Sequence, residues 1–136
     1  MDDMLKTLHI AASGMRAQGA RLRVVAENIA NAESMADAPG GQPYRRRVVT
    51  FDSALDKAIG ATTVKVGDVV PDRSVFPKQF DPSHPAADAD GYVQTPNVNP
   101  LIEMADMREA QRSYEANLNT IRAARTMLQD TIEVLR

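Results

Sequence analysis

Residues 97–136 read NVNPLIEMADMREAQRSYEANLNTIRAARTMLQDTIEVLR, and this stretch decides the fold. Asn99 can cap a helix, Pro100 suits the first helical position, and Glu103 faces the positive end of the helix dipole. No further proline or glycine follows Pro100. The stretch therefore predicts one helix of about 35 residues, which is about 50 Å long at a rise of 1.5 Å per residue.

Apolar side chains recur every seven residues along this helix in two alternating rows. The first row consists of Met107, Tyr114, Ile121, Leu128 and Leu135. The second row consists of Met104, Leu118 and Ile132, and it is interrupted by Gln111 and Arg125. Such a heptad pattern predicts a stripe that is buried against another helix.

Residues 3–31 form a second stretch with heptad spacing and without proline. Its row consists of Leu5, Leu8, Ala12, Met15, Gly19, Leu22, Ala26 and Ile29. Gly14 and Gly19 each cost a helix about 1 kcal/mol relative to alanine, so this helix is marginal alone and needs a partner. The simplest arrangement is an antiparallel coiled coil of the two terminal helices.

The residues between the two helices hold most of the prolines and glycines. They also contain two runs that favour strands, 44–51 and 62–70. We expect a short helical turn at 53–59 and no regular structure in the proline-rich stretch 71–85. The predicted fold is therefore mainly α with a small β-rich insert, divided into a helix at 1–34, the insert at 35–96 and a helix at 97–136.

Composition excludes several classes of function. A net charge of −2, from 16 basic and 18 acidic residues, gives no strong field for nucleic acid or anionic membranes. The chain has no cysteine, so it forms neither disulfides nor thiolate metal sites. It also lacks a run of about 18 apolar residues and a secretory signal at its start, so we expect no membrane span and no general secretory route.

No pattern of residues predicts catalysis or a cofactor. The short span from Asp81 to Asp90, with His84, is the one plausible metal site, but the spacing of its carboxylates fails the calcium-loop pattern. We favour hydrogen-bonded turns there, with Gly91 at positive φ. His9 is interpreted as structural, and the run 45–47 of three arginines as one inward and two solvated side chains. We expect no enzyme, no metal and no cofactor.

Two segments near the start resemble the N-terminal signature shared by flagellar rod, hook and hook-associated axial proteins. They are SGMRAQ at 13–18 and VVAENIANA at 24–32. The paired asparagines Asn28 and Asn31 are the most specific element of the signature. Both lie near the end of the first helix, where their side chains can bond backbone groups and terminate it.

Further segments resemble the proximal-rod branch of that family. They are HPAADADGYV at 84–93, PNVN at 96–99, EMADM at 103–107 and SYEAN at 113–117. The residues that carry the resemblance are Asn28, Asn31, Gly91, Tyr92, Pro96, Asn97, Asn99 and Asn117. Many relatives have threonine soon after the paired asparagines, whereas this chain has Glu33 and Ser34.

The resemblance implies a structural subunit of the proximal rod of the flagellar basal body, in the periplasm. Such a subunit would leave the cell through the flagellar type III export apparatus. It would assemble with copies of itself, other proximal and distal rod proteins and the rod-base adaptor into a helical tube that transmits torque. The alternatives are a different position in the rod or hook, a metal- or ligand-binding module at Asp81 to Asp90, and a soluble coiled-coil adaptor.

Overall fold

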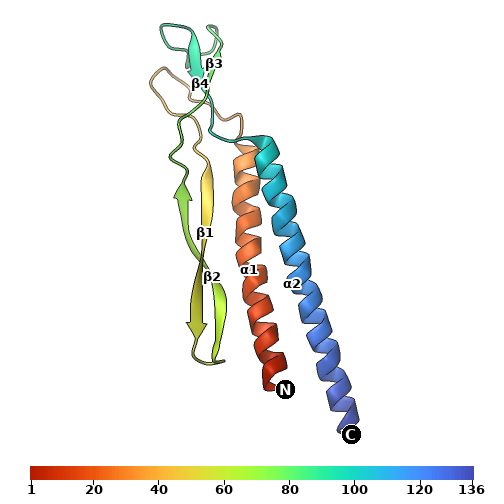
Figure 1. The fold of residues 1–136 in the computed structure, drawn as a ribbon. Coiled ribbons are helices and arrows are strands. Elements are labelled where there is room, and N and C mark those ends of the chain that lie inside the picture. The colour runs from red at the N-terminus through yellow and green to blue at the C-terminus, as the bar shows by residue number, and fades with distance from the viewer. The chain divides into compact units, whose positions relative to one another are not determined.

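A computed structural model describes all residues from 1 to 136 and consists of two long helices and two separate pairs of strands. Helix α1 spans Asp2–Ala30 and helix α2 spans Pro100–Val134 (Figure 1). Because the helices hold 29 and 35 of the 136 residues, the fold is a mixture of helix and β insert and only loosely mainly α. Neither helix has the length and apolar character needed to cross a membrane.

The predicted start of α2 is confirmed. Pro100 is the first helical residue, and the Asn99 Oδ1 accepts a hydrogen bond from the Leu101 N–H at 3.1 Å. This bond satisfies one of the backbone donors that a helix leaves free at its N-terminus. Helix α1 also matches its predicted range to within one residue at each end.

The observed strands differ from the sequence-based prediction at two places. Strand β1 spans Arg47–Asp56 and pairs with β2 at Ala61–Pro71, so residues 53–56 are strand and not a helical turn. Cross-strand pairing outweighs the local helical preference there, and Gly60 turns the chain at a φ of 65°. Strand β3 at Lys78–Phe80 lies inside the stretch expected to be irregular, because Pro77 and Pro82 flank this short strand without interrupting it.

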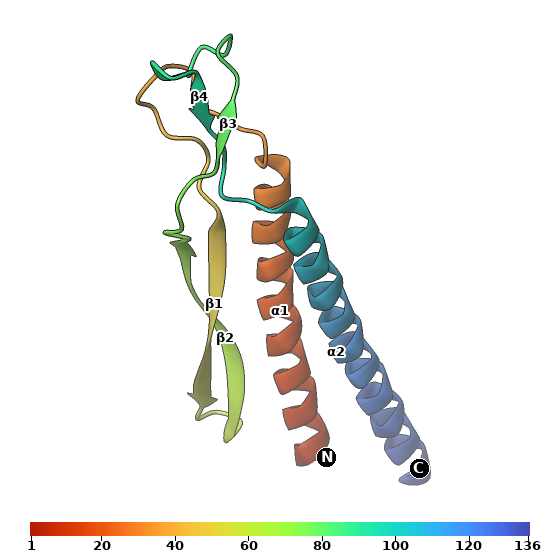
Figure 2. The ribbon, with the colours of Figure 1, turned by 45° about the horizontal axis from the view of Figure 1, so that its top comes forward.

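The chain forms two compact units, and both helices contribute to each. The first unit comprises residues 1–22, 49–68 and 108–136. Within it, α1 lies between the β1–β2 hairpin and α2 (Figure 1, Figure 2). The Val64 N–H donates to the Ser13 Oγ at 3.2 Å, and Arg21 pairs with Glu109 at 3.4 Å. The contacts of Gly14 with Asn117 and of Arg21 with Glu109 mean that the two helices run antiparallel here.

Small side chains occupy the buried positions of the first unit. They are Ala11, Ser13, Ala17, Ala110 and Ala124. Any β-carbon on Gly14 would lie 2.9 Å from the Asn117 Nδ2, so the helix backbone approaches its neighbour closely at this point. Ala110, Asn117 and Ala124 are seven residues apart, and they form a row of small or polar side chains that faces the interior.

The apolar residues predicted to form the helix seam lie beside these small residues and are less buried. Those of partial exposure are Leu8, Met15, Leu22, Ile29, Met107, Tyr114, Leu118, Ile121 and Leu128. Leu5, Ile132 and Leu135 are exposed. The role of these twelve residues as a coiled-coil or assembly seam stays a prediction.

The second unit comprises residues 23–48 and 69–107. Its apolar core contains Val24 and Val25 of α1, Phe76 and Val93. Strand β4 at Tyr92–Gln94 pairs antiparallel with β3, and Gln79 lies opposite Val93. This register turns Val93 to the interior and leaves Lys78, Phe80, Tyr92 and Gln94 exposed on the other face.

Candidate functional site

The second unit is organised around the side chain of Asn28, which is 1% exposed. Its Nδ2 donates to the Arg47 carbonyl at 2.8 Å, and its Oδ1 accepts from the Arg47 N–H at 3.0 Å. The Tyr44 hydroxyl also donates to the Oδ1 at 2.8 Å, and the Nδ2 lies 3.3 Å from the Glu103 Oε2. The amide therefore joins α1 to the first residue of β1, to Tyr44 before that strand and to α2, and all of its hydrogen-bonding capacity is used.

This arrangement corrects the expected role of Asn28. Helix α1 continues to Ala30, and Asn28 does not cap it. Asn31 does bond the helix end, because its Nδ2 donates to the Glu27 carbonyl at 2.9 Å and its Oδ1 accepts from the Ser34 hydroxyl at 3.1 Å. One of the paired asparagines thus closes the helix, and the other holds a distant segment of the chain.

Glu103 is fully buried and forms a charge-assisted pair with the Arg46 guanidinium. Arg46 also reaches Asp72 at 3.3 Å and Asp106 at 3.4 Å, so one guanidinium serves three carboxylates. Removing Arg46 would leave Glu103 buried without its cation, and an uncompensated buried charge typically costs about 3–5 kcal/mol. We name Asn28, Arg46, Asp72 and Glu103 the polar hub.

Electrostatics fix the charges of the polar hub. Burial by itself lowers the pKa of Arg46, but the hydrogen bonds and charges of Glu103 and Asp72 outweigh it, so the pKa is raised. The pKa of Asp72 is lowered, chiefly because its carboxylate accepts the Ser74 N–H. Burial opposes this shift, but the Ser74 hydroxyl and Arg46 add to the lowering. Burial and the charge of Glu27 raise the pKa of Tyr44, so its hydroxyl stays a hydrogen-bond donor at neutral pH.

Asn97 and Arg45 hold the segment that follows β2. The Asn97 Nδ2 donates to the Asp72 carbonyl at 3.0 Å and to the Ser74 Oγ at 3.0 Å, while its Oδ1 accepts from the Arg46 N–H at 2.7 Å. The Arg45 guanidinium stacks over the Phe76 ring at 4.1 Å and donates to the Asp72 carbonyl at 2.7 Å. The arginine run is therefore not solvated as predicted, since only Arg47 is exposed.

The other residues that carry the resemblance have definite structural roles. Gly91 adopts a φ of 85°, as expected, and a β-carbon there would lie 2.9 Å from the Phe80 ring. The Tyr92 ring packs edge-on against Phe80 with centroids 5.3 Å apart. Pro96 is buried, Asn99 caps α2, and Asn117 packs against α1.

The acidic span from Asp81 to Asp90, where the sequence allows a metal site, forms hydrogen-bonded turns. The Asp88 Oδ1 accepts the N–H groups of Asp90 and Tyr92, both at 2.9 Å, and the Asp81 Oδ1 accepts the Ser83 hydroxyl at 2.8 Å. The His84 Nδ1 accepts the Ala86 N–H at 3.0 Å. No cluster of three or more histidine or acidic side chains is arranged to hold a metal ion.

Sequence reasoning missed the burial of Glu103 and its pairing with Arg46. The sequence gives one indication of this burial. Glu103 lies four residues before Met107 and seven before Ala110, so it shares the helix face that carries the interior row of Ala110, Asn117 and Ala124. The partner of Glu103 is 57 residues away in the chain, and no local pattern identifies it.

Comparison with known proteins places both ends of the chain in flagellar rod families. Residues 8–33 match the family "Flagella basal body rod protein", and residues 89–134 match "Flagellar basal body rod FlgEFG protein C-terminal". The flagellar basal-body rod protein FlgC of Agrobacterium fabrum is 53% identical over 136 residues, which cover 100% of this chain and 98% of the relative.

More distant relatives carry the same name. FlgC of Escherichia coli O6:H1 is 40% identical over 131 residues, which cover 95% of this chain and 96% of the relative. FlgC of Bacillus subtilis is 38% identical over 143 residues, which cover 94% and 95%. The similarity thus extends through the insert as well as both helices.

Proposed function

The chain belongs to the FlgC family and is a structural subunit of the flagellar basal-body rod, and we propose that its terminal helices pair as an antiparallel coiled coil in the wall of that rod. In this proposal residues 1–34 and 97–136 form the rod domain, and residues 35–96 brace neighbouring subunits. The close approach of Gly14 to Asn117 supports the helix pairing.

The observation that carries the proposal is the number of large apolar side chains that a single chain leaves exposed along both helices. They include Leu5, Ile10, Leu101, Ile102, Met104, Met127, Ile132 and Leu135. Leu101 and Met104 lie three residues apart on α2, as do Ile132 and Leu135, so each pair shares one face of the helix. Contiguous exposed apolar surface of this kind marks a contact with a neighbour, because its burial is favourable. We infer that neighbouring helices, from copies of this chain and from other rod proteins, cover them.

The proposal extends to position and export. We infer that the subunit lies in the proximal, periplasmic part of the rod, contacts the rod-base adaptor and the other proximal and distal rod proteins, and passes through the flagellar type III export apparatus unfolded. The lack of cysteine and the weak N-terminal helix suit passage through a narrow channel. No side chain is required to perform chemistry in this role.

Electron microscopy of basal bodies from cells with an in-frame deletion of the gene tests the proposal. We expect the membrane rings to assemble while the rod and all later structures are missing, and we expect the intact gene to restore swimming. Complete, rotating flagella in the deletion strain would contradict the proposed role. Replacing the exposed apolar residues of α2 gives a second test. Ile102→Ser and Met104→Ser should each leave export intact and reduce rod assembly. Asn119→Ser, at an exposed polar position of the same helix, is the control and should change neither.

A further inference from the structure

Residues 72–76 form an extended segment that is held unusually firmly for a stretch without secondary structure. The carbonyls of Asp72 and Ser74 both accept hydrogen bonds from Arg45 and Asn97. The Asp72 carboxylate accepts the Ser74 N–H at 2.9 Å, and the Phe76 ring is buried beneath the Arg45 guanidinium. Every second residue of the segment is thus fixed to the body of the second unit.

The alternate residues of the segment point the other way, since side chains in extended backbone alternate between faces. Val75 is 88% exposed, more than any other large apolar residue of the chain. Arg73 is exposed and makes no ion pair or hydrogen bond. Because the backbone under Val75 and Arg73 is already fixed, little conformational entropy would be lost if these side chains bound a partner.

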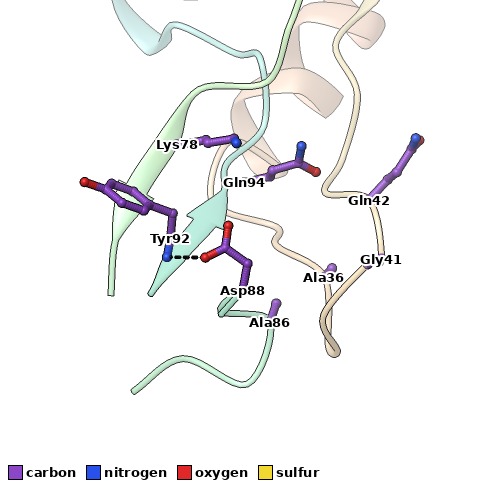
Figure 3. Close-up of a pocket in the computed structure, with 9 residues that line it drawn as sticks. Ala36, Gly41, Gln42, Lys78, Ala86, Asp88, Tyr92 and Gln94 are labelled. Atoms are coloured by element: carbon purple, nitrogen blue, oxygen red, sulfur yellow. Dashed lines mark hydrogen bonds between the residues drawn. The ribbon is translucent and has the colours of Figure 1, made fainter. Parts of the chain in front are cut away.

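The same unit contains a groove with complementary properties. Its volume is about 330 Å³, and it lies between residues 36–42 and the β3–β4 pair. Small residues line part of it, namely Ala36, Gly40, Gly41 and Ala86. Figure 3 shows the side chains of Lys78, Gln94 and Asp88 in this region, while the Tyr92 ring points away from the loop that bears Gly41.

The polar groups of the groove match an extended segment that carries a cation. The Asp88 Oδ1 is occupied by two backbone N–H groups, which leaves the Oδ2 for a partner. Lys78 and Asp88 line the groove, and Asp37 and Asp90 are exposed nearby on the segments that bear it, so three carboxylates outnumber the one cation and the surroundings favour positive charge. The Lys78 and Gln94 side chains supply donors for backbone carbonyls.

We propose that the Arg73–Val75 element of one copy docks into this groove of a second copy, with Val75 against the small residues and Arg73 paired with Asp88. The contact joins two different surfaces of the same chain, so it is head-to-tail and repeats around a ring or along a helix. The inference rests on the proposed function, because it assigns one of the contacts through which copies assemble in the rod.

Disulfide cross-linking between two differently tagged copies tests the contact, and the chain has no cysteine of its own. Cells without the wild-type gene would co-express Val75→Cys with one tag and Ala86→Cys with another. Oxidation of isolated basal bodies should join the two tags in one covalent dimer. The pair Val75→Cys and Leu55→Cys serves as the matched control, since Leu55 is exposed on the hairpin, and it should give no dimer.

The outcomes separate this contact from the proposed function. If both tagged chains are present in basal bodies but no mixed dimer forms, the contact is wrong while the rod role stands. A cross-link from Val75→Cys to a different rod protein would likewise overturn the second copy as the occupant. If the tagged chains are absent from these basal bodies, and the chain is also absent from basal bodies of a strain that carries the intact gene, the proposed function itself fails.

Substitutions give a second, independent readout. Arg73→Glu should reduce rod assembly and swimming, because reversing the charge at position 73 turns the attraction to Asp88 into a repulsion. Arg23→Glu, at an exposed position of α1, should have little effect.

Ala86→Trp should fill the groove and impair assembly, while Ala89→Trp in the same loop should not. Equal swimming by the members of either pair would overturn the proposal, and circular dichroism of the purified chains would report any loss of folding.

Discussion

The side-chain amide of Asn28 forms hydrogen bonds with both the N–H and the carbonyl of Arg47. The amide thus pairs with one backbone residue as a neighbouring strand would, although Asn28 itself lies in a helix. The segment that leads into β1 is held to α1 by this pair. Because the side chain is buried, each of these hydrogen bonds must be replaced or lost when the residue is changed.

Asn28→Asp should destabilise the protein strongly. Aspartate has the same shape, but it removes the two N–H donors and places a second carboxylate beside the buried Glu103. We expect a loss of about 3 kcal/mol or more in the free energy of unfolding, measured by urea denaturation of the purified chain. Asn119→Asp, on the exposed face of α2, is the control and should cost less than about 0.5 kcal/mol. Similar losses for the two variants would contradict the role assigned to Asn28.

Glu103→Ala should cost about 1–3 kcal/mol, because Arg46 and Asn28 lose a buried hydrogen-bond partner while Asp72 and Asp106 still pair with the guanidinium. Glu103→Gln keeps the shape and one acceptor, so we expect a smaller loss. The midpoint of urea denaturation measures both effects, and Glu115→Ala at an exposed site provides the comparison. An unchanged midpoint in Glu103→Ala would mean that Arg46 is adequately balanced by Asp72 and Asp106 alone.

The two glycines of α1 should respond to alanine in opposite directions. At Gly14 the new β-carbon would meet the Asn117 side chain at 2.9 Å, whereas at Gly19 nothing lies within 4 Å. Alanine at position 19 should therefore stabilise the helix by up to about 1 kcal/mol. Gly14→Ala should lose that benefit or destabilise the chain, because helices or side chains must move apart. Thermal denaturation followed by circular dichroism tests the contrast, which would disappear if the helices did not approach at Gly14.

Acid should weaken the polar hub through Asp72. Its pKa is lowered in the folded chain, so its contribution to stability is present above the ordinary carboxyl pKa of about 3.9 and is lost as the pH falls through the lowered folded value. We expect wild type to lose more stability than Asp72→Asn below about pH 4, and the two to differ by a constant amount at higher pH. Urea denaturation at each pH measures the free energy of unfolding of both proteins. If the two free energies change in parallel across the acid range, the protonation of Asp72 is not linked to folding.

The sequence predicts the helices well because their signals are local. Asn99 and Pro100 mark the start of α2 through cap chemistry that needs no tertiary contact, and the absence of later proline or glycine lets the helix continue. The strand at residues 53–56 and the short β3 were missed, because each depends on a partner strand and not on its own composition.

The candidate site was harder to predict because its members are far apart in the chain. Glu103 suits a helix N-terminus on local grounds, which hides its pairing with Arg46. Asn28 likewise lies near a helix end, and only the tertiary structure brings Arg47 to it. The heptad pattern draws attention to large side chains, whereas four of the six buried apolar positions along the helices hold alanine, which allows close backbone approach.

The alanine-rich interior has a consequence for temperature. Four of the eight buried apolar residues are alanine, and each of them exposes less apolar surface on unfolding than a leucine or phenylalanine in its place would. The heat-capacity change on unfolding scales with that surface and sets the curvature of stability against temperature. We therefore expect a smaller heat-capacity change on unfolding, and a flatter stability curve, than for a chain of equal length with a large aliphatic core.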